Sequence, residues 1–576
     1  MTARAGAPGP RAHGAAAPDA GLVARAEAWM RDDPDPATRA EVAALLAAGD
    51  TAALAERFDR PLEFGTAGIR GEIGAGPGRM NRAVVRRTAA ALARVVAAQG
   101  ERAAGRGVVV GRDARHGSAE FADDVAEVVA AHGVRALSFS RPLPTPITAF
   151  AVRHLGAAAG AMVTASHNPA RDNGVKVYLA DGAQVVPPYD AQIAEAAAAA
   201  PEPGGAPRRV AERATVDERE VLDAYRDAVL ALVDPAAPRE LAIVYTPLHG
   251  VGNALVPDLL ERAGFARPLV VAAQAEPDPD FPTLSFPNPE EPGALDLAIA
   301  DARRTGADLV VANDPDADRL AVAVPGARAG EWRVLSGDEL GILLADHLVG
   351  QSSGADRLVA TTIVSSTMLA ALAAEQGVAY VETLTGFKWI ARAAARRPGH
   401  RLLFGYEEAL GYAVSDAVAD KDGMSAAVVA AELAARAKSS GTTLPDLLDG
   451  LSSRLGVHES AQWSLRLDGP DAPSEIARVV ARWRHDPPAT LAGLEVTEAV
   501  DLATGDGELP PTDAVVVRAG GRARVVVRPS GTEPKLKAYL LVTTPPVRRD
   551  ELAAARREAS QLLEALRADV ARRCAR

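Results

Sequence analysis

Residues 309–319 read Leu-Val-Val-Ala-Asn-Asp-Pro-Asp-Ala-Asp-Arg, an apolar run followed at once by a polar, acidic loop. A short aliphatic run that ends in Asn, Asp or Pro is typical of a buried strand that feeds a loop. Alanine-rich, helix-like stretches separate this run from others of the same form at 108–110, 161–163, 241–244, 402–404 and 525–527. This alternation predicts α/β layers with a largely parallel sheet. Ligands of such sheets bind beyond the carboxyl ends of the strands, so we expect the chemistry in the loops.

The acidic loop places Asp314, Asp316 and Asp318 at alternate positions, from which three carboxylates can converge on one hard cation. An EF-hand loop starts in the same way, but it requires Gly and Glu where this chain has Arg319 and Pro325. Three carboxylates so close together repel one another unless a metal or a cationic group lies between them. The loop therefore predicts a metal site, and a solvated acidic loop is the alternative.

A second polar loop, Thr164–Pro169, also follows an apolar run. Its Ser166 precedes a histidine and an asparagine on a tight turn, with Lys176 close by, which favours an exposed hydroxyl in a polar pocket. The G-x-S-x-G elbow of α/β-hydrolases is absent here, which argues against a serine hydrolase. A plain turn is the alternative, because Ser, Asn and Pro all favour turns.

Two further loops carry polar groups of a distinct kind. The segment Phe404–Tyr412 holds the paired acids Glu407 and Glu408, which can accept hydrogen bonds from sugar hydroxyls. A helix N-terminus with favourable acids explains that pattern equally well. The segment Arg528–Lys535 combines an arginine, two hydroxyls and backbone N–H groups around a glycine, which predicts a cradle for an oxyanion such as phosphate. A hairpin turn without function is the alternative for this segment.

The composition excludes several classes of protein. The chain has 576 residues, 48% of them hydrophobic and 24% charged, as in an ordinary globular protein, and its length suggests about four domains. A formal charge of -12 argues against general nucleic-acid binding, and no apolar stretch is long enough to span a membrane. The single cysteine, Cys574, excludes a disulfide framework and a cysteine metal site. Residues 1–20 are expected to form a disordered tail.

Lysine is rare in this chain, because only six of the 63 basic residues are lysines. Lys438 lies away from the four loops. The other five lysines lie in or near these loops or in the segment Thr385–Lys388: Lys176, Lys388, Lys421, Lys535 and Lys537. A primary amine is compact and can lose its proton when buried, whereas a guanidinium stays charged. A lysine surrounded by cations is expected to have a lowered pKa, which suits a general base.

Taken together, the four loops resemble those of the α-D-phosphohexomutase family, the phosphoglucomutases, phosphomannomutases and their relatives. They follow the family's order of phosphoserine, metal, sugar and phosphate loops, and the resemblance extends from about Phe64 to Tyr539. Three more segments share it, at 64–71, 111–115 and 245–250. It implies three similar mixed α/β domains and a smaller C-terminal α+β domain around a central cleft. After the tail at 1–20, the expected domains are 21–236, 237–350, 351–455 and 456–576.

The resemblance also implies a role for each candidate residue, with Ser166 carrying the phosphoryl group. The implied ligands of Mg²⁺ are Ser166, Asp314, Asp316 and Asp318. The implied catalytic residues are Arg70, Ser166, His167, Lys176, Arg319 and Lys421. The implied substrate-binding residues are Thr385, Gly386, Lys388, Glu407, Ala409, Arg528, Ser530, Gly531 and Thr532.

The implied reaction moves a phosphoryl group between C1 and C6 of an aldohexose phosphate, with glucose phosphate expected first. It passes through a phosphoserine and a sugar 1,6-bisphosphate, which also acts as activator, and the general base is His167, Lys176 or Lys421. Ala409 and Leu410 stand where many members have a serine, so the chain looks closest to the phosphoglucomutase and phosphopentomutase branch. Mannose and pentose phosphates are the alternatives. The expected partner is a small sugar phosphate, with no nucleic acid or membrane, for a cytoplasmic monomer or homodimer.

Two other interpretations of the loops are open. A strand followed by Asp314-x-Asp316 also opens the aspartyl-phosphate enzymes of the haloacid dehalogenase type, where Asp314 would be the nucleophile, but that family lacks the loop of Arg528. The second interpretation is a catalytically inactive protein that binds sugar phosphates. Labelling by substrate separates them, because phosphoserine survives acid, aspartyl phosphate is labile to hydroxylamine, and a binding protein takes no label.

Overall fold

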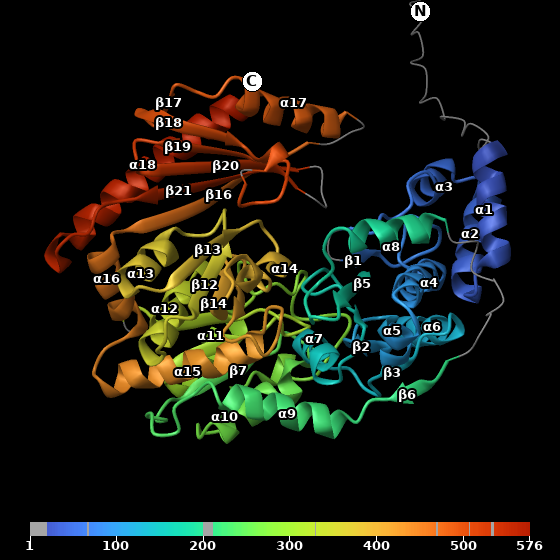
Figure 1. Cartoon of the computed structure of the whole chain (residues 1–576), viewed down its shortest axis with the longest axis horizontal. Helices are drawn as coiled ribbons and strands as arrows, with labels where there is room; N and C mark the ends of the chain where they lie inside the picture. Colours follow the sequence, from blue (N-terminus) through green and yellow to red (C-terminus); the bar gives the residue numbers. More distant parts are fainter. Residues whose placement is uncertain are drawn as a thin grey trace, which may run out of the picture.

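The structure is a computed structural model that describes residues 20–65, 68–199, 211–328, 330–467, 471–505, 507–530 and 535–575. The tail expected at 1–20 lies outside these residues except for its last position. Four sheets follow one another along the chain, each built from one continuous stretch of sequence. Figure 1 shows the first sheet on the right, the next two below and to the left, and the last above the third.

The first sheet has the strand order β1-β5-β4-β2-β3-β6. Its strands are β1 (Gly68–Glu72), β2 (Val108–Arg112), β3 (Ala136–Ser138), β4 (Ala159–Val163), β5 (Asp172–Leu179) and β6 (Arg213–Thr215). Strand β2 is parallel to β3 and β4, whereas β5 is antiparallel to β4 and β1. The helices of this part are α4 (Arg82–Ala98), α5 (Glu101–Arg106), α6 (Ser118–Ala131), α7 (Thr145–His154) and α8 (Tyr189–Ala198).

Three helices precede this sheet and pack on its outer side (Figure 1): α1 (Ala20–Asp32), α2 (Pro36–Ala48) and α3 (Thr51–Phe58). They share a small core of their own around Trp29, Leu54 and Phe58. The aspartates before α2 and α3 cap those helices by accepting hydrogen bonds from backbone N–H groups that have no partner inside the helix.

Helix α9 (Glu218–Leu230) leads to the second sheet, which has the order β11-β10-β9-β7-β8. Its strands are β7 (Ile243–Thr246), β8 (Leu269–Val270), β9 (Leu309–Ala312), β10 (Ala321–Pro325) and β11 (Trp332–Val334). Strands β7 and β9 are parallel, and β10 returns antiparallel to β9. The helices here are α10 (Val256–Arg262) and α11 (Asp296–Thr305).

The third sheet has the order β13-β12-β14-β15. Its strands are β12 (Arg357–Thr362), β13 (Ala379–Thr383), β14 (Arg401–Glu407) and β15 (Gly411–Ala413), of which only β15 is antiparallel to its neighbour. The helices are α12 (Gly337–Gln351), α13 (Met368–Gln376), α14 (Phe387–Ile390), α15 (Gly423–Ser439) and α16 (Leu444–Leu455). One hydrophobic core joins the first three sheets, with Tyr178, Tyr245 and Tyr406 as members from each in turn.

The fourth sheet, with the order β16-β21-β20-β19-β18-β17, is antiparallel throughout. Its strands are β16 (His458–Arg466), β17 (Thr490–Leu491), β18 (Leu494–Asp501), β19 (Val515–Ala519), β20 (Ala523–Pro529) and β21 (Lys535–Thr543). Helices α17 (Ala472–His485) and α18 (Leu552–Cys574) pack against it. A separate apolar cluster, which includes Val364, Leu384, Val526 and Tyr539, joins this sheet to the third.

The expected fold class, three mixed α/β units and a smaller α+β unit, is confirmed. The expectation of largely parallel pairing is wrong for the fourth sheet, and each of the other three contains an antiparallel strand. All six apolar runs belong to strands, although 241–242 lie just before β7. The proposed domain boundaries remain predictions.

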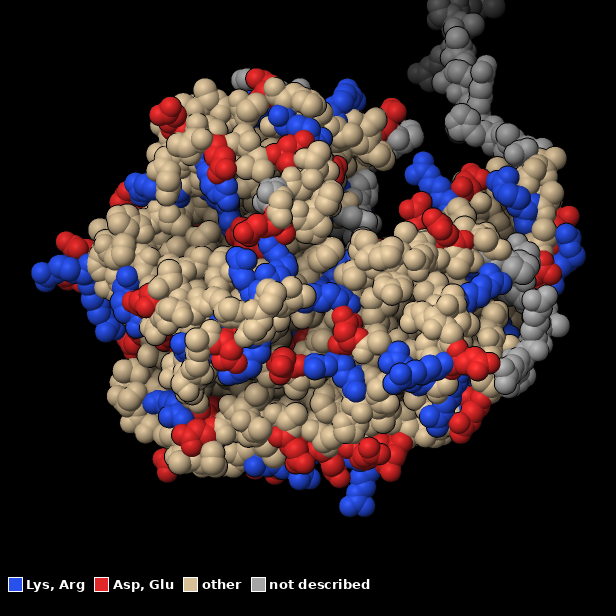
Figure 2. Space-filling model, viewed as in Figure 1, with Lys and Arg blue, Asp and Glu red and all other residues tan. Residues whose placement is uncertain are grey.

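The face of the molecule drawn in Figure 2 carries basic and acidic side chains interspersed with one another. A notch opens on this face between the C-terminal sheet and the N-terminal helices, where Figure 1 shows the fourth sheet opposite α3 and α8. Within the described ranges, none of the helices combines the length and the apolar character that crossing a membrane requires.

Candidate active site

The four predicted loops are the turns of four antiparallel strand pairs: β4–β5, β9–β10, β14–β15 and β20–β21. A loop of this length reverses the chain, because a crossover to a parallel strand needs a dozen or more residues. Each of the first three loops therefore leaves a buried strand and returns beside it, which holds its polar side chains at the end of the sheet. Contacts between the first three loops show that they meet in space.

Ser166 lies in the turn after β4, where its backbone has a φ of +54°. This left-handed conformation is unfavourable for a non-glycine residue, so surrounding contacts must hold it. Its amide donates to Thr164 Oγ1 at 2.8 Å, and Arg115 donates to its carbonyl oxygen at 2.6 Å. The Ser166 hydroxyl donates to Asp314 Oδ2 at 3.0 Å and lies 3.2 Å from His167 Nδ1. The fold thus brings the predicted serine to the acidic loop.

The aspartates of the acidic loop, Asp314, Asp316 and Asp318, are fully buried, so the alternative of a solvated loop is wrong. One carboxylate oxygen from each lies within 4.8 Å of the others. Lys176, on β5 of the first sheet, donates to Asp316 Oδ2 at 2.7 Å and to Asp318 Oδ2 at 2.8 Å. The acidic loop of the second sheet is therefore held by a lysine of the first.

The aspartate cluster fits a divalent cation. Among the described residues, Asp316 Oδ1 and Asp318 Oδ1 are buried oxygens that have no hydrogen-bond partner. Burial, followed by the charges of Asp316 and Asp318, raises the pKa of Asp314 well above its usual range. Crowded negative charge and free carboxylate oxygens are what a hard cation with oxygen ligands relieves.

Lys421, in the loop between β15 and α15, lies 3.4 Å from Asp318 Oδ2. Burial acts against the charge of both Lys176 and Lys421, but the carboxylates around them outweigh it and raise the pKa of each lysine. The expectation of a lowered lysine pKa is therefore wrong for these two residues. The reason is that they face aspartates rather than other cations, so both are ammonium groups at neutral pH.

Two arginines and a histidine lie close to this cluster. Burial, followed by the charges of Arg319 and Arg70, lowers the pKa of His167 well below its usual value, so its imidazole is neutral. Arg70 is exposed, and the charge of Arg319 acts against the charge of its guanidinium. Arg319 Nη1 pairs with Glu290 at 3.2 Å, and its buried Nε has no partner in the described part of the chain. Neighbouring positive charges repel one another, and an anionic ligand such as a phosphoryl group relieves that repulsion.

Glu407 and Glu408 lie at the turn of the hairpin β14–β15, so the helix N-terminus considered for them is wrong. Neighbouring residues at a strand end point to opposite sides. Burial raises the pKa of Glu407 while Lys421 opposes the rise, which places Glu407 on the side of the lysine. Glu408 instead accepts a hydrogen bond from Ser365 Oγ at 2.8 Å, and burial, followed by the charge of Glu407, raises its pKa to about 7.

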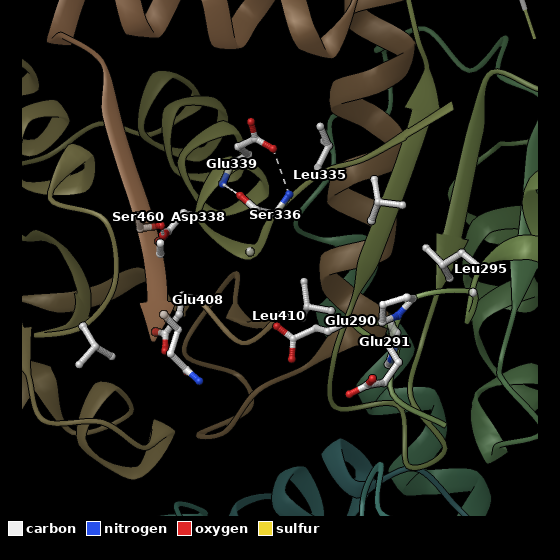
Figure 3. A pocket seen from close by; sticks show the side chains of 18 of the residues that line it. Glu290, Glu291, Leu295, Leu335, Ser336, Asp338, Glu339, Glu408, Leu410 and Ser460 are labelled. Atoms are coloured by element: carbon white, nitrogen blue, oxygen red, sulfur yellow. Dashed lines mark hydrogen bonds between the residues drawn. The ribbon is translucent and has the colours of Figure 1, made fainter. Parts of the chain in front are cut away.

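Glu408 also lines a cavity of about 510 Å³. Figure 3 shows this cavity with Glu408, Leu410 and Glu290 along its lower edge and with Ser336 and Glu339 hydrogen-bonded to each other above. Its walls come from the second, third and fourth sheets and their connections, and, of the described residues in the four predicted polar loops, only Glu408 and Leu410 contribute to them.

The third and fourth sheets bring two predicted substrate segments together. Arg528, near the end of β20, donates from Nη1 to Thr385 Oγ1 at 2.5 Å. The amide of Ser530 donates to the carbonyl of Lys535 at 2.7 Å, at the base of the hairpin β20–β21. Gly531 and Thr532 lie outside the described residues.

The remaining predicted substrate residues lie beside these segments. Gly386 has a φ of +107°, which favours glycine, and it directly precedes α14. Lys388, on α14, is buried; its ammonium donates to the carbonyl of Val185 at 3.4 Å and lies over the ring of Trp389. Burial lowers the pKa of Lys388 to about 8. Ala409 is half-buried in the turn of the hairpin β14–β15.

Sequence reasoning missed three residues at this site, Glu290, Asp420 and Tyr178, and it named Arg115 only within the segment 111–115. Glu290 follows a proline-rich stretch that gives no signal of chemistry. Asp420 directly precedes Lys421, so its position beside a rare lysine is a signal that could have found it. Tyr178 is buried and bonds to Asp420 at 3.0 Å, which the sequence does not indicate.

Comparison with known protein families gives four consecutive matches along the chain. The family descriptions are Phosphoglucomutase/phosphomannomutase, alpha/beta/alpha domains I, II and III, and they match residues 61–203, 223–327 and 336–454. The C-terminal domain of the same family matches residues 475–559.

Individual relatives agree with these matches. A Haemophilus influenzae protein named "Probable phosphomannomutase" is 42% identical over 468 residues, which cover 80% of this chain and 92% of that protein. The phosphopentomutase of Mus musculus is 35% identical over 577 residues, covering 92% of each chain. The open form of parafusin (phosphoglucomutase) from Paramecium has the same fold, with a TM-score of 0.68 at 18% identity over 89% of this chain and 96% of that one.

Proposed function

The chain belongs to the phosphoglucomutase/phosphomannomutase family and is an isomerase of the intramolecular phosphotransferase class, and we propose that it interconverts glucose 1-phosphate and glucose 6-phosphate. The phosphoryl group moves between C1 and C6 through a phosphoserine at Ser166 and a sugar 1,6-bisphosphate, which also primes the enzyme. The observation that carries this proposal is the Ser166 hydroxyl, held 3.0 Å from Asp314 at the edge of a buried aspartate cluster. The small sugar phosphate is then its partner.

In the proposed transfer, a sugar hydroxyl oxygen forms a bond to phosphorus while the bond between phosphorus and Ser166 Oγ breaks. The oxygen of Ser166 leaves with that electron pair and takes up a proton, and the hydroxyl proton passes to the protein. The neutral imidazole of His167, 3.2 Å from the Ser166 hydroxyl, supports a role in the proton exchange at the serine. Lys176 and Lys421 are charged, which supports donation of a proton to a departing sugar oxygen in the reverse direction.

Asp314, Asp316 and Asp318, together with the phosphorylated Ser166, would hold Mg²⁺. When bound, this ion supplies positive charge to the phosphoryl oxygens. Arg319 and Arg70 add fixed positive charge on the side of His167, where a guanidinium stabilises charge that develops during transfer.

The substrate is proposed to lie between the third and fourth sheets and the aspartate cluster. Glu407 accepts hydrogen bonds from sugar hydroxyls, with Ala409 beside it. The non-reacting phosphate is held by the loop at the tip of β20–β21 and by the segment that it contacts, through Arg528, Ser530, Gly531, Thr532, Thr385, Gly386 and Lys388. The contact between Arg528 and Thr385 supports this arrangement, because it joins the two segments into one surface.

A phosphopentomutase is the second candidate. The observation that favours it is the relative of that name, which aligns with 92% of this chain. The Haemophilus influenzae relative, named as a probable phosphomannomutase, likewise supports a phosphomannomutase. Purified enzyme assayed side by side on glucose 1-phosphate, mannose 1-phosphate and ribose 1-phosphate assigns the sugar by kcat/KM.

Replacement of the proposed nucleophile tests the reaction itself. Ser166→Ala should lower turnover by at least about a thousandfold, because the residue that carries the phosphoryl group is lost. The parent should form an acid-stable phosphoserine with a sugar bisphosphate, and Ser166→Ala should take no label. Ser138→Ala, on β3 of the same sheet, is the control and should be labelled like the parent. Turnover by Ser166→Ala at a rate comparable with the parent contradicts the phosphoserine mechanism.

A further inference from the structure

The carboxylate of Asp420 is buried and uses both of its oxygens, although none of the predicted roles includes it. Its Oδ1 accepts a hydrogen bond from the Lys421 amide at 2.8 Å and lies 3.4 Å from the Lys421 ammonium. Its Oδ2 accepts from the Tyr178 hydroxyl at 3.0 Å and from Gln184 Nε2 at 2.8 Å. Both donors to Oδ2 come from the first domain, whereas Asp420 belongs to the third.

These two donors are held firmly in place. Tyr178 is fully buried on β5, two residues beyond Lys176, and residues i and i+2 of a strand lie on the same face. Gln184 follows the same strand, and its carbonyl accepts a hydrogen bond from Arg392 at 2.8 Å. Arg392 also pairs with both carboxylate oxygens of Asp181. The orientation of the Asp420 carboxylate is therefore set from the first domain.

The Lys421 ammonium lies between two carboxylates, 3.4 Å from Asp318 Oδ2 and 3.4 Å from Asp420 Oδ1. The charges of Glu407, Arg319 and Lys176 also act on it, and the ring of Phe387 lies 5.6 Å away. A lysine ammonium on its flexible stem takes whatever position its partners fix. Asp420 attracts the ammonium from the same distance as Asp318, so the two carboxylates together fix its position.

We propose that Asp420 is a positioning residue for Lys421, and that Tyr178 holds Asp420 in the required orientation. A strand of the first domain then sets where the ammonium of the third domain lies, and the same strand carries Lys176. This inference rests on the proposed function, in which Lys421 exchanges a proton with the sugar oxygen.

The same loop offers a matched control. Tyr225, on α9, is also buried, and its hydroxyl donates to Asp422 Oδ2 at 2.8 Å. Asp422 caps the N-terminus of α15 through the amides of Met424 and Ser425. Tyr225→Phe and Tyr178→Phe thus each remove one buried hydroxyl that binds a carboxylate in residues 420–422, but only Tyr178 acts on the partner of the Lys421 ammonium.

The test compares these two variants in the full chain. Both should lower the midpoint of thermal unfolding by similar amounts. Tyr178→Phe should lower kcat about tenfold, as expected for a lost hydrogen bond to a charged group, and leave KM within about twofold. Tyr225→Phe should leave kcat within about twofold of the parent. Asp420→Asn, which keeps the shape of the side chain, should lower kcat further than Tyr178→Phe.

The position of Lys421 is also measured without turnover. Acetic anhydride followed by peptide mass spectrometry should acetylate Lys421 faster in Tyr178→Phe than in Tyr225→Phe. Equal losses of kcat in the two tyrosine variants, or equal acetylation, overturn the inference and leave both tyrosines as contacts between domains. If the parent turns over none of the three sugar phosphates, the proposed function fails, and the acetylation result still decides the position of Lys421.

Discussion

Asp318 is the residue at which the first three domains meet. Its Oδ2 accepts a hydrogen bond from Lys176 at 2.8 Å and lies 3.4 Å from the ammonium of Lys421. Burial acts to raise the pKa of Asp318, but the two lysines outweigh it and lower that pKa. Buried charges of this kind depend on one another, because removing one partner leaves the others without compensation.

Metal removal tests the aspartate cluster at this scale. Excess EDTA should abolish turnover, and Mg²⁺ should restore it. Asp316→Asn should lower kcat/KM by at least about a hundredfold, because several kcal/mol of charge stabilisation are lost. Asp308→Asn is the control, since that carboxylate lies just before β9 and bonds to the amide of Ala242 and to Lys438. Full activity in excess EDTA would exclude the metal from the reaction.

At the scale of elements, the hairpin β14–β15 separates two neighbouring acids. Glu407 faces Lys421, whereas Glu408 bonds to Ser365 and lines the cavity of Figure 3. The pairing of Glu407 with Gly411 closes the hairpin at this point, and Leu410 takes a φ of +61° in the turn. The turn thus gives the two neighbouring acids different surroundings.

The raised pKa of Glu408, about 7, predicts a pH-dependent stability. A carboxyl with a pKa above its unfolded value contributes stability that is fully present below the unfolded pKa and is lost as pH rises through the folded pKa. Glu408→Gln cannot ionise and so does not lose this stability. The thermal midpoint of Glu408→Gln minus that of the parent should therefore increase as the pH is raised from about 5 to about 8. Glu331→Gln, at an exposed glutamate, is the control. A difference between Glu408→Gln and parent that does not vary with pH contradicts the assignment.

At the scale of the whole molecule, Glu432 of α15 connects the second and third domains. It is fully buried and accepts hydrogen bonds from the amide of Asp234 at 2.9 Å, from Arg436 at 3.0 Å and from Arg239 at 3.3 Å. His347, on α12, lies 3.6 Å from the same carboxylate. This buried cluster lies away from the proposed site and belongs to the packing of the domains.

Glu432→Ala should therefore destabilise the molecule by at least about 2 kcal/mol, because it removes a fully buried carboxylate and leaves the Asp234 amide and two partly exposed arginines without that acceptor. Glu564→Ala removes an exposed glutamate that pairs with Arg567 at 3.8 Å and should cost less than about 0.5 kcal/mol. Thermal unfolding of both variants measures the difference, with the midpoint as readout because several domains unfold. A thermal midpoint of Glu432→Ala as high as that of Glu564→Ala would show that the cluster does not support the domains.

The sequence by itself determined six of the strands, the loops that follow them and the residue types that the proposed chemistry needs. The run at 309–312 is apolar because β9 is buried, and polar residues follow because the loop leaves the sheet. Such patterns are local, so the chain between Thr164 and Pro169 or between Asp314 and Arg319 carries them without reference to the rest of the molecule. The same patterns, taken in order, indicated the family.

Only the tertiary structure decided which charges face one another. Lys176 and Asp316 are 140 residues apart in sequence, and Tyr178 and Asp420 are 242 apart, so no local pattern records their contact. The direction of the pKa shifts of Lys176 and Lys421 depends on these partners, and the sequence-based expectation was wrong for these two lysines because it assumed cations as the neighbours. Glu407 and Glu408 are likewise the same residue type in the sequence, and the hairpin directs their side chains to different surroundings. Packing of distant strands fixes such environments, because burial and charge act through space and not along the chain.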